Sequence, residues 1–272
     1  MKIPKNFKGI DGKKAYNKIV NEVKEKSNKP VTQINPIQIQ EHDKYDYFFA
    51  GINEYNLYKQ FVETNFPKTQ QTGLQTLEEL SKPTLENKLF KASSPIINSA
   101  LNMALRNQGI QVVTQAQLEY VFQNNLLELS NIYSDTGMCL RTKEGANQEH
   151  AKDLIKQLEN QELPVYLPII SYDLELDKDN HLKFKIIDKT KIIHIPILNS
   201  SGGNFNNEEI DLNKGFPKQL DENGGRSFFT RQDGLSRCCL VRDSILNSDS
   251  SDLSYSNDYG RVVLAKPRSG WA

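Results

Sequence analysis

Residues 234–264 read GLSRCCLVRDSILNSDSSDLSYSNDYGRVVL, and their composition differs from that of the chain as a whole. Lys, Glu and Gln account for 61 of the 272 residues, so 24 residues of average composition would contain about five of them. Residues 238–261 contain none, and they also lack Met and Trp. In the stretch 143–160, by contrast, eight of 18 residues are Lys, Glu or Gln. The segment 238–261 therefore draws on a restricted set of amino acids.

The genetic code offers one explanation of this restricted set. An Asn codon (AAC or AAT) whose two adenines are randomised encodes fifteen amino acids, and never Lys, Glu, Gln, Met or Trp. Every residue of 238–261 belongs to those fifteen. The alternative explanation is an ordinary surface loop, which also favours Ser, Asp and Asn because their side chains stabilise turns.

Alternate positions of 239–248 differ in chemistry. Successive side chains of a strand project to opposite faces. The odd-numbered face would carry Cys, Val, Asp, Ile and Asn, whereas the even-numbered face would carry Leu, Arg, Ser, Leu and Ser. A core face would be apolar and an ordinary solvent face polar. The mixed odd-numbered face is typical of interchangeable contact positions.

The remaining sequence predicts helices first and strands afterwards. Helical periodicity covers 94–107 and 147–160, and Thr114 with Gln117 forms a capping box that begins another helix. After Pro164 the periodicity changes to two. The predicted strands and hairpin cover 164–170, 173–187, 191–198, 225–231, 234–242 and 260–266. This order predicts an α+β fold with an antiparallel sheet rather than alternating βαβ units.

The first part of the chain has features of its own. Apolar residues between positions 15 and 23 predict a short amphipathic helix, and the spacing over 50–64 predicts a second one. The stretch 65–84 is rich in Thr, Gln and Pro, which is typical of a connection between domains. We therefore expect a mainly helical N-terminal segment over 1–84 and a second domain over 85–272.

Charge and composition exclude several classes of protein. The 34 Lys and Arg residues balance 34 Asp and Glu residues, which argues against non-specific nucleic-acid binding as the main activity. No apolar run approaches the length of a membrane-spanning helix, and the N-terminus lacks the apolar region of a signal peptide. The three cysteines, Cys139, Cys238 and Cys239, are expected to be reduced in a cytoplasmic protein.

Three stretches of the chain resemble the variable proteins of diversity-generating retroelements, in the forms found in archaea and candidate bacterial phyla. They are 137–169, 192–205 and 234–264, and the last is the most specific, with its GLSR start, DLSYS centre and GRVV end. Separately, GIQVVTQAQLEYVF (109–122) is similar to the capped helix of C-type-lectin folds of the formylglycine-generating-enzyme type.

The resemblance implies a C-type-lectin-like domain whose C-terminal strands and loops display hypervariable residues. In such proteins a reverse transcriptase copies a template with errors at adenines, and the copy replaces the 3′ end of the gene. The resemblance therefore implies a non-enzymatic, ligand-binding protein without cofactor or metal, whose partner is a protein or another macromolecule. Among the display positions, Tyr255 and Tyr259 are expected to act as amphipathic anchors.

The resemblance also divides the segment into two sets of positions. The implied ligand-binding, variable positions are Cys239, Val241, Asp243, Ile245, Asn247, Asp249, Ser250, Ser251, Tyr255, Asn257 and Tyr259. The implied scaffold positions are Gly234, Leu235, Arg237, Leu240, Arg242, Leu246, Ser248, Leu253, Ser256, Gly260 and Arg261.

Two other functions remain as alternatives. One is an oxidase of the formylglycine-generating type, although such enzymes use a separated pair of cysteines. Adjacent Cys238 and Cys239 would project to opposite faces of a strand, so we expect the first in the core and the second on display. The other is a nucleic-acid-associated protein that uses the late arginines. We expect those arginines instead to bind scaffold carbonyls and Asp252 or Asp258. They are Arg226, Arg231, Arg237, Arg242 and Arg261.

Metal binding has little support in the sequence. The oxygen-bearing side chains near the C-terminus do not have the spacing of an EF-hand loop, and the sugar-binding tripeptides Glu-Pro-Asn and Gln-Pro-Asp are absent. The four histidines lack zinc-ligand spacing. We expect these side chains to stabilise turns or to lie in solvent.

Overall fold

The computed structural model describes residues 6–7, 10–11, 41–70, 75–159, 161–242 and 244–269. The chain divides into two units, Met1–Glu41 and His42–Ala272. In the first, Asn6–Phe7 (β1) and Ile10–Asp11 (β2) pair as antiparallel strands. The helix predicted between positions 15 and 23 lies outside the described residues. The other described elements lie in the second unit, except that the 3-10 turn Glu41–Lys44 begins at the last residue of the first.

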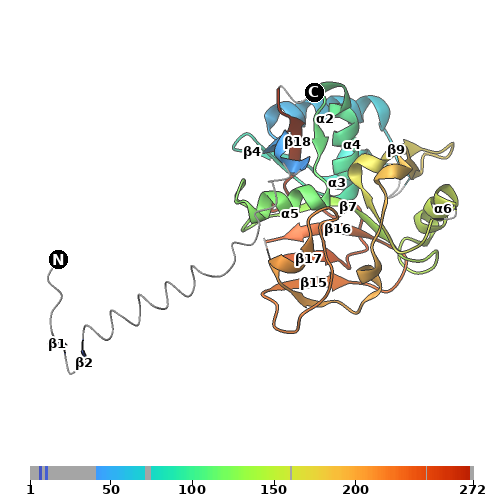
Figure 1. The fold of residues 1–272 in the computed structure, drawn as a ribbon. Helices are drawn as coiled ribbons and strands as arrows, with labels where there is room; N and C mark the ends of the chain where they lie inside the picture. Colours follow the sequence, from blue (N-terminus) through green and yellow to red (C-terminus); the bar gives the residue numbers. More distant parts are fainter. Residues whose placement is uncertain are drawn as a thin grey trace. The chain divides into compact units, whose positions relative to one another are not determined.

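A seven-stranded sheet forms the centre of the second unit, in the order β11-β8-β7-β16-β17-β15-β12 (Figure 1). Its strands are β7 (Tyr133–Leu140), β8 (Val165–Pro168), β11 (Ile193–His194), β12 (Gly203–Phe205), β15 (Arg226–Thr230), β16 (Leu235–Val241) and β17 (Ile245–Ser248). All neighbours are antiparallel except β15 and β17, which are parallel. The predicted mixed α+β architecture with an antiparallel-rich sheet is therefore confirmed.

The two central strands, β7 and β16, are buried along almost their whole length. On one face they pack against helices α4 (Pro95–Leu105) and α6 (Gln148–Leu158) and near the hairpin of β9 (Tyr172–Leu176) and β10 (Leu182–Ile186). On the other face lie the rings of Phe205, Phe216 and Phe228, and helix α5 (Gln115–Gln123) covers Leu240. Burial on both faces explains why these strands are rich in apolar residues.

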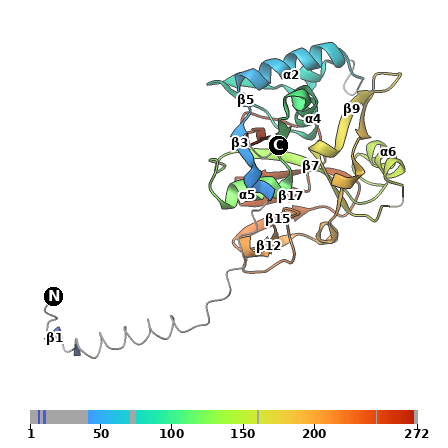
Figure 2. The same ribbon diagram turned by 45° about the horizontal axis from the view of Figure 1, so that its top comes forward.

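A smaller sheet pairs strands from the beginning and from the end of the second unit's sequence. Its order is β3-β18-β6, so the last strand of the chain lies between two early ones. The bounds are β3 (Tyr45–Phe49), β6 (Gln111–Val112) and β18 (Val263–Pro267). Helices α2 (Ile52–Asn65) and α3 (Leu77–Ser81) and the hairpin of β4 (Thr84–Glu86) and β5 (Leu89–Lys91) complete this end. In both views α2 lies at the opposite end of the unit from β15 (Figure 1, Figure 2).

Short elements connect these layers. The pair β13 (Ile210–Asp211) and β14 (Phe216–Pro217) is antiparallel. The 3-10 turns are η1 (Glu41–Lys44), η2 (Arg106–Gln108), η3 (Ile169–Ser171), η4 (Lys189–Lys191), η5 (Pro196–Asn199) and η6 (Asn207–Glu209). Within the described residues, no helix combines the length and the apolar character needed to cross a bilayer.

The domain boundary expected within 65–84 does not coincide with the division between the units, which falls between Glu41 and His42. Tyr58 and Phe66 lie in the same core cluster as Leu101 of α4. The Thr/Gln/Pro-rich composition marks the connection between α2 and α3, both of which contribute to that core.

Several local predictions are confirmed. The helix predicted over 94–107 is present as α4 and η2, and Ser94 caps α4 by accepting a hydrogen bond from the N–H of Ile97 (3.2 Å). The capping box at the start of α5 is present, with Thr114 N–H donating to Gln117 Oε1 (2.9 Å). The hairpin after Pro168 forms as expected. The strand predicted over 191–198 is wrong beyond β11, because Pro196 begins a 3-10 turn.

Gly137 on β7 has no room for a side chain. A Cβ atom there would lie 2.1 Å from the backbone oxygen of Leu167 on the neighbouring strand. Gly137→Ala must push two paired strands apart, and we expect a loss of about 1–3 kcal/mol of stability. Gly225→Ala is the control, because a Cβ atom there has nothing within 4 Å. Urea unfolding measures both variants, and equal midpoints would contradict the expectation.

Candidate binding surface

The hairpin of β16 and β17 has one face turned to the core. Leu240, Leu246 and Phe228 are register partners on β16, β17 and β15, and all three are buried. Directly opposite residues of neighbouring strands project to the same face, and the face alternates along each strand. The residues on either side of this row therefore project to the opposite face, which we call the outer face.

Two rows of register partners make up the outer face. The first row consists of Val241, Ile245 and Ser227. The second row consists of Cys239, Asn247 and Phe229. Exposure increases along the second row from β16 to β15: Cys239 is 4% exposed, Asn247 is half-buried and Phe229 is 50% exposed. The outer face is thus open to solvent over β17 and β15.

The loop that follows β17 is held largely through its main chain. Arg237 Nη1 donates to the carbonyl oxygen of Tyr255 (3.0 Å), and the Arg237 N–H donates to that of Ser250 (3.0 Å). Asn147 Nδ2 donates to the carbonyl oxygen of Ser251 (2.7 Å). These three contacts do not depend on which side chain the loop residue carries.

The end of the loop is anchored in the same way by Tyr133. Its hydroxyl accepts a hydrogen bond from the N–H of Asn257 (3.0 Å), and its own N–H donates to the carbonyl oxygen of Tyr259 (3.2 Å). Three display positions also act through side chains, and in one of these contacts Asn257 Nδ2 donates to the Tyr255 hydroxyl (2.8 Å). Asn247 Oδ1 accepts from the N–H of Asp249 (3.0 Å), and Asn257 Oδ1 accepts from the N–H of Tyr259 (2.9 Å). Asparagine at these two positions therefore stabilises local turns.

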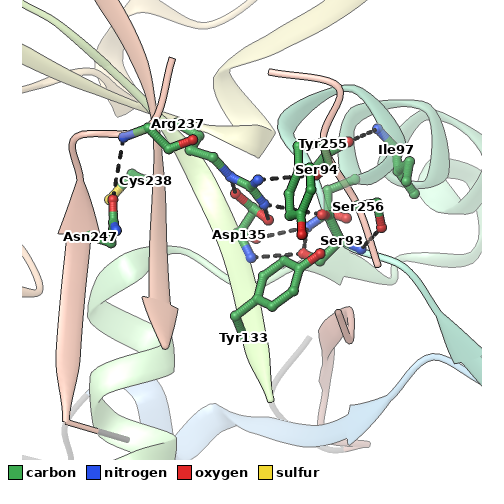
Figure 3. A network of polar contacts seen from close by, with 12 residues as sticks. Ser93, Ser94, Ile97, Tyr133, Asp135, Arg237, Cys238, Asn247, Tyr255 and Ser256 are labelled. Carbon is green, nitrogen blue, oxygen red and sulfur yellow. Dashed lines mark hydrogen bonds and ion pairs between the residues drawn. The ribbon is translucent and has the colours of Figure 1, made fainter. Parts of the chain in front are cut away.

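A buried ion pair lies beneath this loop (Figure 3). The Arg237 guanidinium donates from Nε to Asp135 Oδ1 (2.7 Å) and from Nη2 to Asp135 Oδ2, and both side chains are buried. Nη2 also donates to the carbonyl oxygen of Ser93 (3.2 Å). Burial alone lowers the pKa of Arg237, but the adjacent carboxylate of Asp135 raises it overall, so the arginine stays charged.

Ser93 and Ser256 extend the network toward α4. The Ser93 N–H donates to Ser256 Oγ (3.0 Å), and Ser93 Oγ accepts from the N–H of Asp135 (2.8 Å). The Tyr255 ring lies 5.9 Å from the Arg237 guanidinium carbon, on the side where the loop passes. The network therefore connects β7, β16, the start of α4 and the loop through hydrogen bonds (Figure 3).

A second buried guanidinium, that of Arg141, holds the other side of the hairpin. Its Nη2 donates to the Ser248 hydroxyl (2.8 Å) and to Thr230 Oγ1 (2.7 Å), and its Nη1 donates to Ser236 Oγ (2.9 Å). Because Thr230 lies on β15 and Ser248 on β17, this side chain connects three neighbouring strands. Ser248 is one of the implied scaffold positions.

The late arginines Arg231 and Arg237 make the expected contacts with carbonyl oxygens, but the carboxylate partners differ from those expected. Arg237 pairs with Asp135, and Arg226 pairs with buried Glu119 through two hydrogen bonds of 2.7 and 2.9 Å. Arg231 pairs with Asp233 (3.0 Å). The expectation of Asp252 or Asp258 is therefore wrong for these three. The carboxylates that bind Arg237 and Arg226 lie on earlier elements, β7 and α5.

Arg261 fulfils the expectation of carbonyl contacts. Its Nη1 donates to the carbonyl oxygens of Asp258 (2.7 Å) and Gly260 (2.7 Å). Arg242 is exposed, in the turn between β16 and β17, with a φ of +50°. Its implied scaffold role is not reflected in burial. This turn also interrupts the continuous alternation expected over 239–248.

Among the implied variable positions, the strand register groups Val241, Ile245 and Asn247, and hydrogen bonds join Asn257 to Tyr255 and Tyr259. Exposed positions are Asp249, Ser251, Tyr255 and Tyr259. Half-buried positions are Val241, Ile245, Asn247, Ser250 and Asn257. The predicted exposure of Cys239 is wrong. Cys239 is buried, and it lies opposite buried Asp135 in the strand register. Asp243 lies outside the described residues.

The implied scaffold positions follow the opposite pattern. Those that are buried are Gly234, Leu235, Arg237, Leu240, Leu246, Ser248, Leu253 and Gly260. Ser256 and Arg261 are half-buried, like five of the variable positions. Burial therefore separates most of the two sets, and Cys239 and Arg242 are exceptions.

Phe229 is an exposed residue of this face that the sequence interpretation omits. It lies directly opposite Asn247 across the parallel pairing of β15 and β17. Its neighbour Phe228 is 1% exposed. The alternation rule offered a signal, because two adjacent phenylalanines in a strand must project to opposite faces.

The three thiols are buried. Cys238 lies in the core cluster, as expected, and burial raises its pKa well above the ordinary value. Burial also raises the pKa of Cys239 to about 12. Burial alone would raise the pKa of Cys139, but hydrogen bonding to Cys238 and the nearby Arg141 lower it overall. Solvent does not reach any of the three sulfur atoms readily.

A cluster of two aspartates with a histidine and a shallow hollow are two other candidate ligand sites. Asp177, Asp179 and His181 gather in the turn of the β9–β10 hairpin, where Asp177 Oδ1 accepts hydrogen bonds from the N–H groups of the other two (2.9 Å each). These contacts are those of a turn-forming carboxylate. The shallow hollow lined by Leu118, Leu129, Ile132, Ser134 and Leu240 is too small to hold a water molecule. It lies on the side of Leu240, away from the outer face, and offers no room for a small-molecule ligand.

Comparison of the chain with protein-family models, with curated proteins and with solved structures finds no match.

The ion pair of Arg237 predicts a large effect of a small substitution. Asp135→Asn leaves a buried guanidinium without its counter-charge, and we expect a loss of about 3–5 kcal/mol of stability. Asp233→Asn is the matched control, because it removes the carboxylate of the more exposed pair with Arg231 and should cost less than about 1 kcal/mol. Chemical denaturation measures both. Similar losses for the two variants would show that the buried pair has no special role.

Burial of the thiols predicts slow chemical modification. The native protein at pH 8 should show no thiol that reacts rapidly with a chromogenic disulfide reagent, whereas all three cysteines should react after unfolding in guanidinium chloride. A thiol that reacts rapidly in the native protein would contradict this expectation and would favour the oxidase alternative.

Proposed function

We propose that this protein binds a macromolecular ligand through the outer face and the loop 249–259, on a C-type-lectin-like scaffold. We further propose that retroelement-directed mutagenesis at adenines diversifies this segment. The observation that carries the proposal is the agreement between two independent patterns. Of the implied variable positions that the structure describes, all except Cys239 are exposed or half-buried, whereas eight of the eleven implied scaffold positions are buried.

The contacts of the loop supply a physical reason for tolerance to substitution. The protein holds Ser250, Ser251 and Tyr255 through their carbonyl oxygens. Main-chain contacts of this kind persist when the side chain changes. Exposed substitutions usually alter stability by less than about 0.5 kcal/mol. The same fold can therefore support many different surfaces.

The two alternative functions have less support. An oxidase that uses cysteine needs a thiol within reach of its substrate, and the three thiols are buried. A nucleic-acid-binding surface needs free cationic side chains. Buried carboxylates instead neutralise Arg226 and Arg237, and the Arg141 guanidinium donates its hydrogen bonds to groups inside the sheet.

Sequencing of the 3′ end of the gene across a population of source cells tests the proposal. We expect substitutions to concentrate in codons for positions 239–259, and to be confined to codons that end in C or T. The codons for the buried residues Leu246 and Leu253 are internal controls and should stay constant. Substitutions spread evenly along the gene would contradict retroelement-directed diversification.

A further inference from the structure

We propose that the ligand is a folded protein and that Phe229, which lies outside the segment 238–261, is a constant apolar anchor for it. The inference rests on the proposed function, because it concerns the same outer face. To the proposed function it adds a contact residue on β15, outside the variable segment, and it specifies that the ligand is a folded protein.

The strand register places Phe229 within the outer face. Phe229 and Asn247 are register partners across β15 and β17. Ser227 and Ile245, two positions earlier on each strand, are the next pair that projects to the same face. Four consecutive register pairs join these strands, so the position of Phe229 relative to the display residues is fixed by the backbone. Every variant of the segment 238–261 would therefore present its side chains beside the same ring.

The exposure of Phe229 has no explanation within the fold. Half of its surface is accessible, and the ring carries no polar atom that would favour contact with water. The core already has an aromatic side chain from this strand, because Phe228 fills the opposite face. Tyr255 and Tyr259 on the adjacent loop are 50% and 63% exposed. Phe and Tyr are enriched in the cores of protein interfaces, and Tyr is frequent among the few residues that dominate the binding energy.

Charge argues against a nucleic acid as the ligand. The segment 238–261 contains four aspartates and two arginines, which gives a formal net charge of −2, whereas the whole chain has a net charge of zero. A phosphate backbone requires the opposite sign. The negative charge is instead complementary to a protein surface that carries Lys or Arg.

Shape and composition argue for a protein rather than a small molecule. The shallow hollow on the side of Leu240 lies away from the outer face and is too small to hold a ligand. The segment is rich in Tyr, Ser, Asn and Asp around an apolar strand surface. Tyrosine with small polar side chains is the usual composition of antibody surfaces that bind proteins.

A display experiment tests the inference with a defined probe. A library of the full chain is randomised at Val241, Ile245, Asn247, Tyr255 and Tyr259 with codons that end in C or T, and binders are selected against lysozyme, a basic folded protein. Phe229→Ala is then introduced into the selected clones. We expect the dissociation constant to rise at least about tenfold, the size of effect expected for an interface hot spot.

Leu126→Ala is the matched control, because Leu126 is also a large exposed apolar residue (44%) but follows α5 on the other side of the sheet. It should change the dissociation constant less than about twofold. Phe229→Tyr retains the ring and should bind nearly as well as the parent. If Phe229→Ala fails to fold, as judged by its melting temperature, Phe229→Gln replaces it.

The outcomes separate the two proposals. Binders that lose no more affinity with Phe229→Ala than with Leu126→Ala would overturn the anchor role and leave the proposed function standing. A library that yields no binders, although its members fold, would count against the proposed function and against this inference with it. Binders that depend on Phe229 in several unrelated clones would support both.

Discussion

A guanidinium buried in a protein interior must be neutralised and hydrogen-bonded, because its transfer from water costs several kcal/mol. Arg237 meets both requirements with the carboxylate of Asp135 and the carbonyl oxygens of Ser93 and Tyr255. Each partner belongs to a different part of the chain. The pair therefore fixes how the loop after β17 lies against β7 and α4, and the geometry of the proposed binding surface depends on it.

The interior polar network and the outer surface are chemically separate. Arg237 and Asn147 contact the loop at carbonyl oxygens, and Arg141 contacts the serine and threonine hydroxyls inside the sheet. Very little of the network depends on side chains that face solvent. Asn247 and Asn257 are the exceptions, since their amide oxygens cap turns of the loop. Substitution at these two positions should cost more than at the other display positions.

Local features of the fold were predictable from the sequence, and long-range partners were not. The caps of α4 and α5 depend on residues three positions apart, which a sequence shows directly. Asp135 is 102 positions from Arg237, and no spacing rule connects them. The burial of Cys239 also required the strand register, because its own sequence position predicted exposure. Phe229 was within reach of the alternation rule, but its partner Asn247 across β15 and β17 was not.

The position of β18 has a consequence for the integrity of the gene. This strand follows the segment 238–261 and completes a sheet with β3 and β6, from the early part of the chain. A frameshift anywhere in that segment would remove the buried side chains of Val263, Leu264 and Ala265, and the early strands would lose the strand between them. Under the proposed diversification, only copies that keep the reading frame would therefore encode a chain that folds.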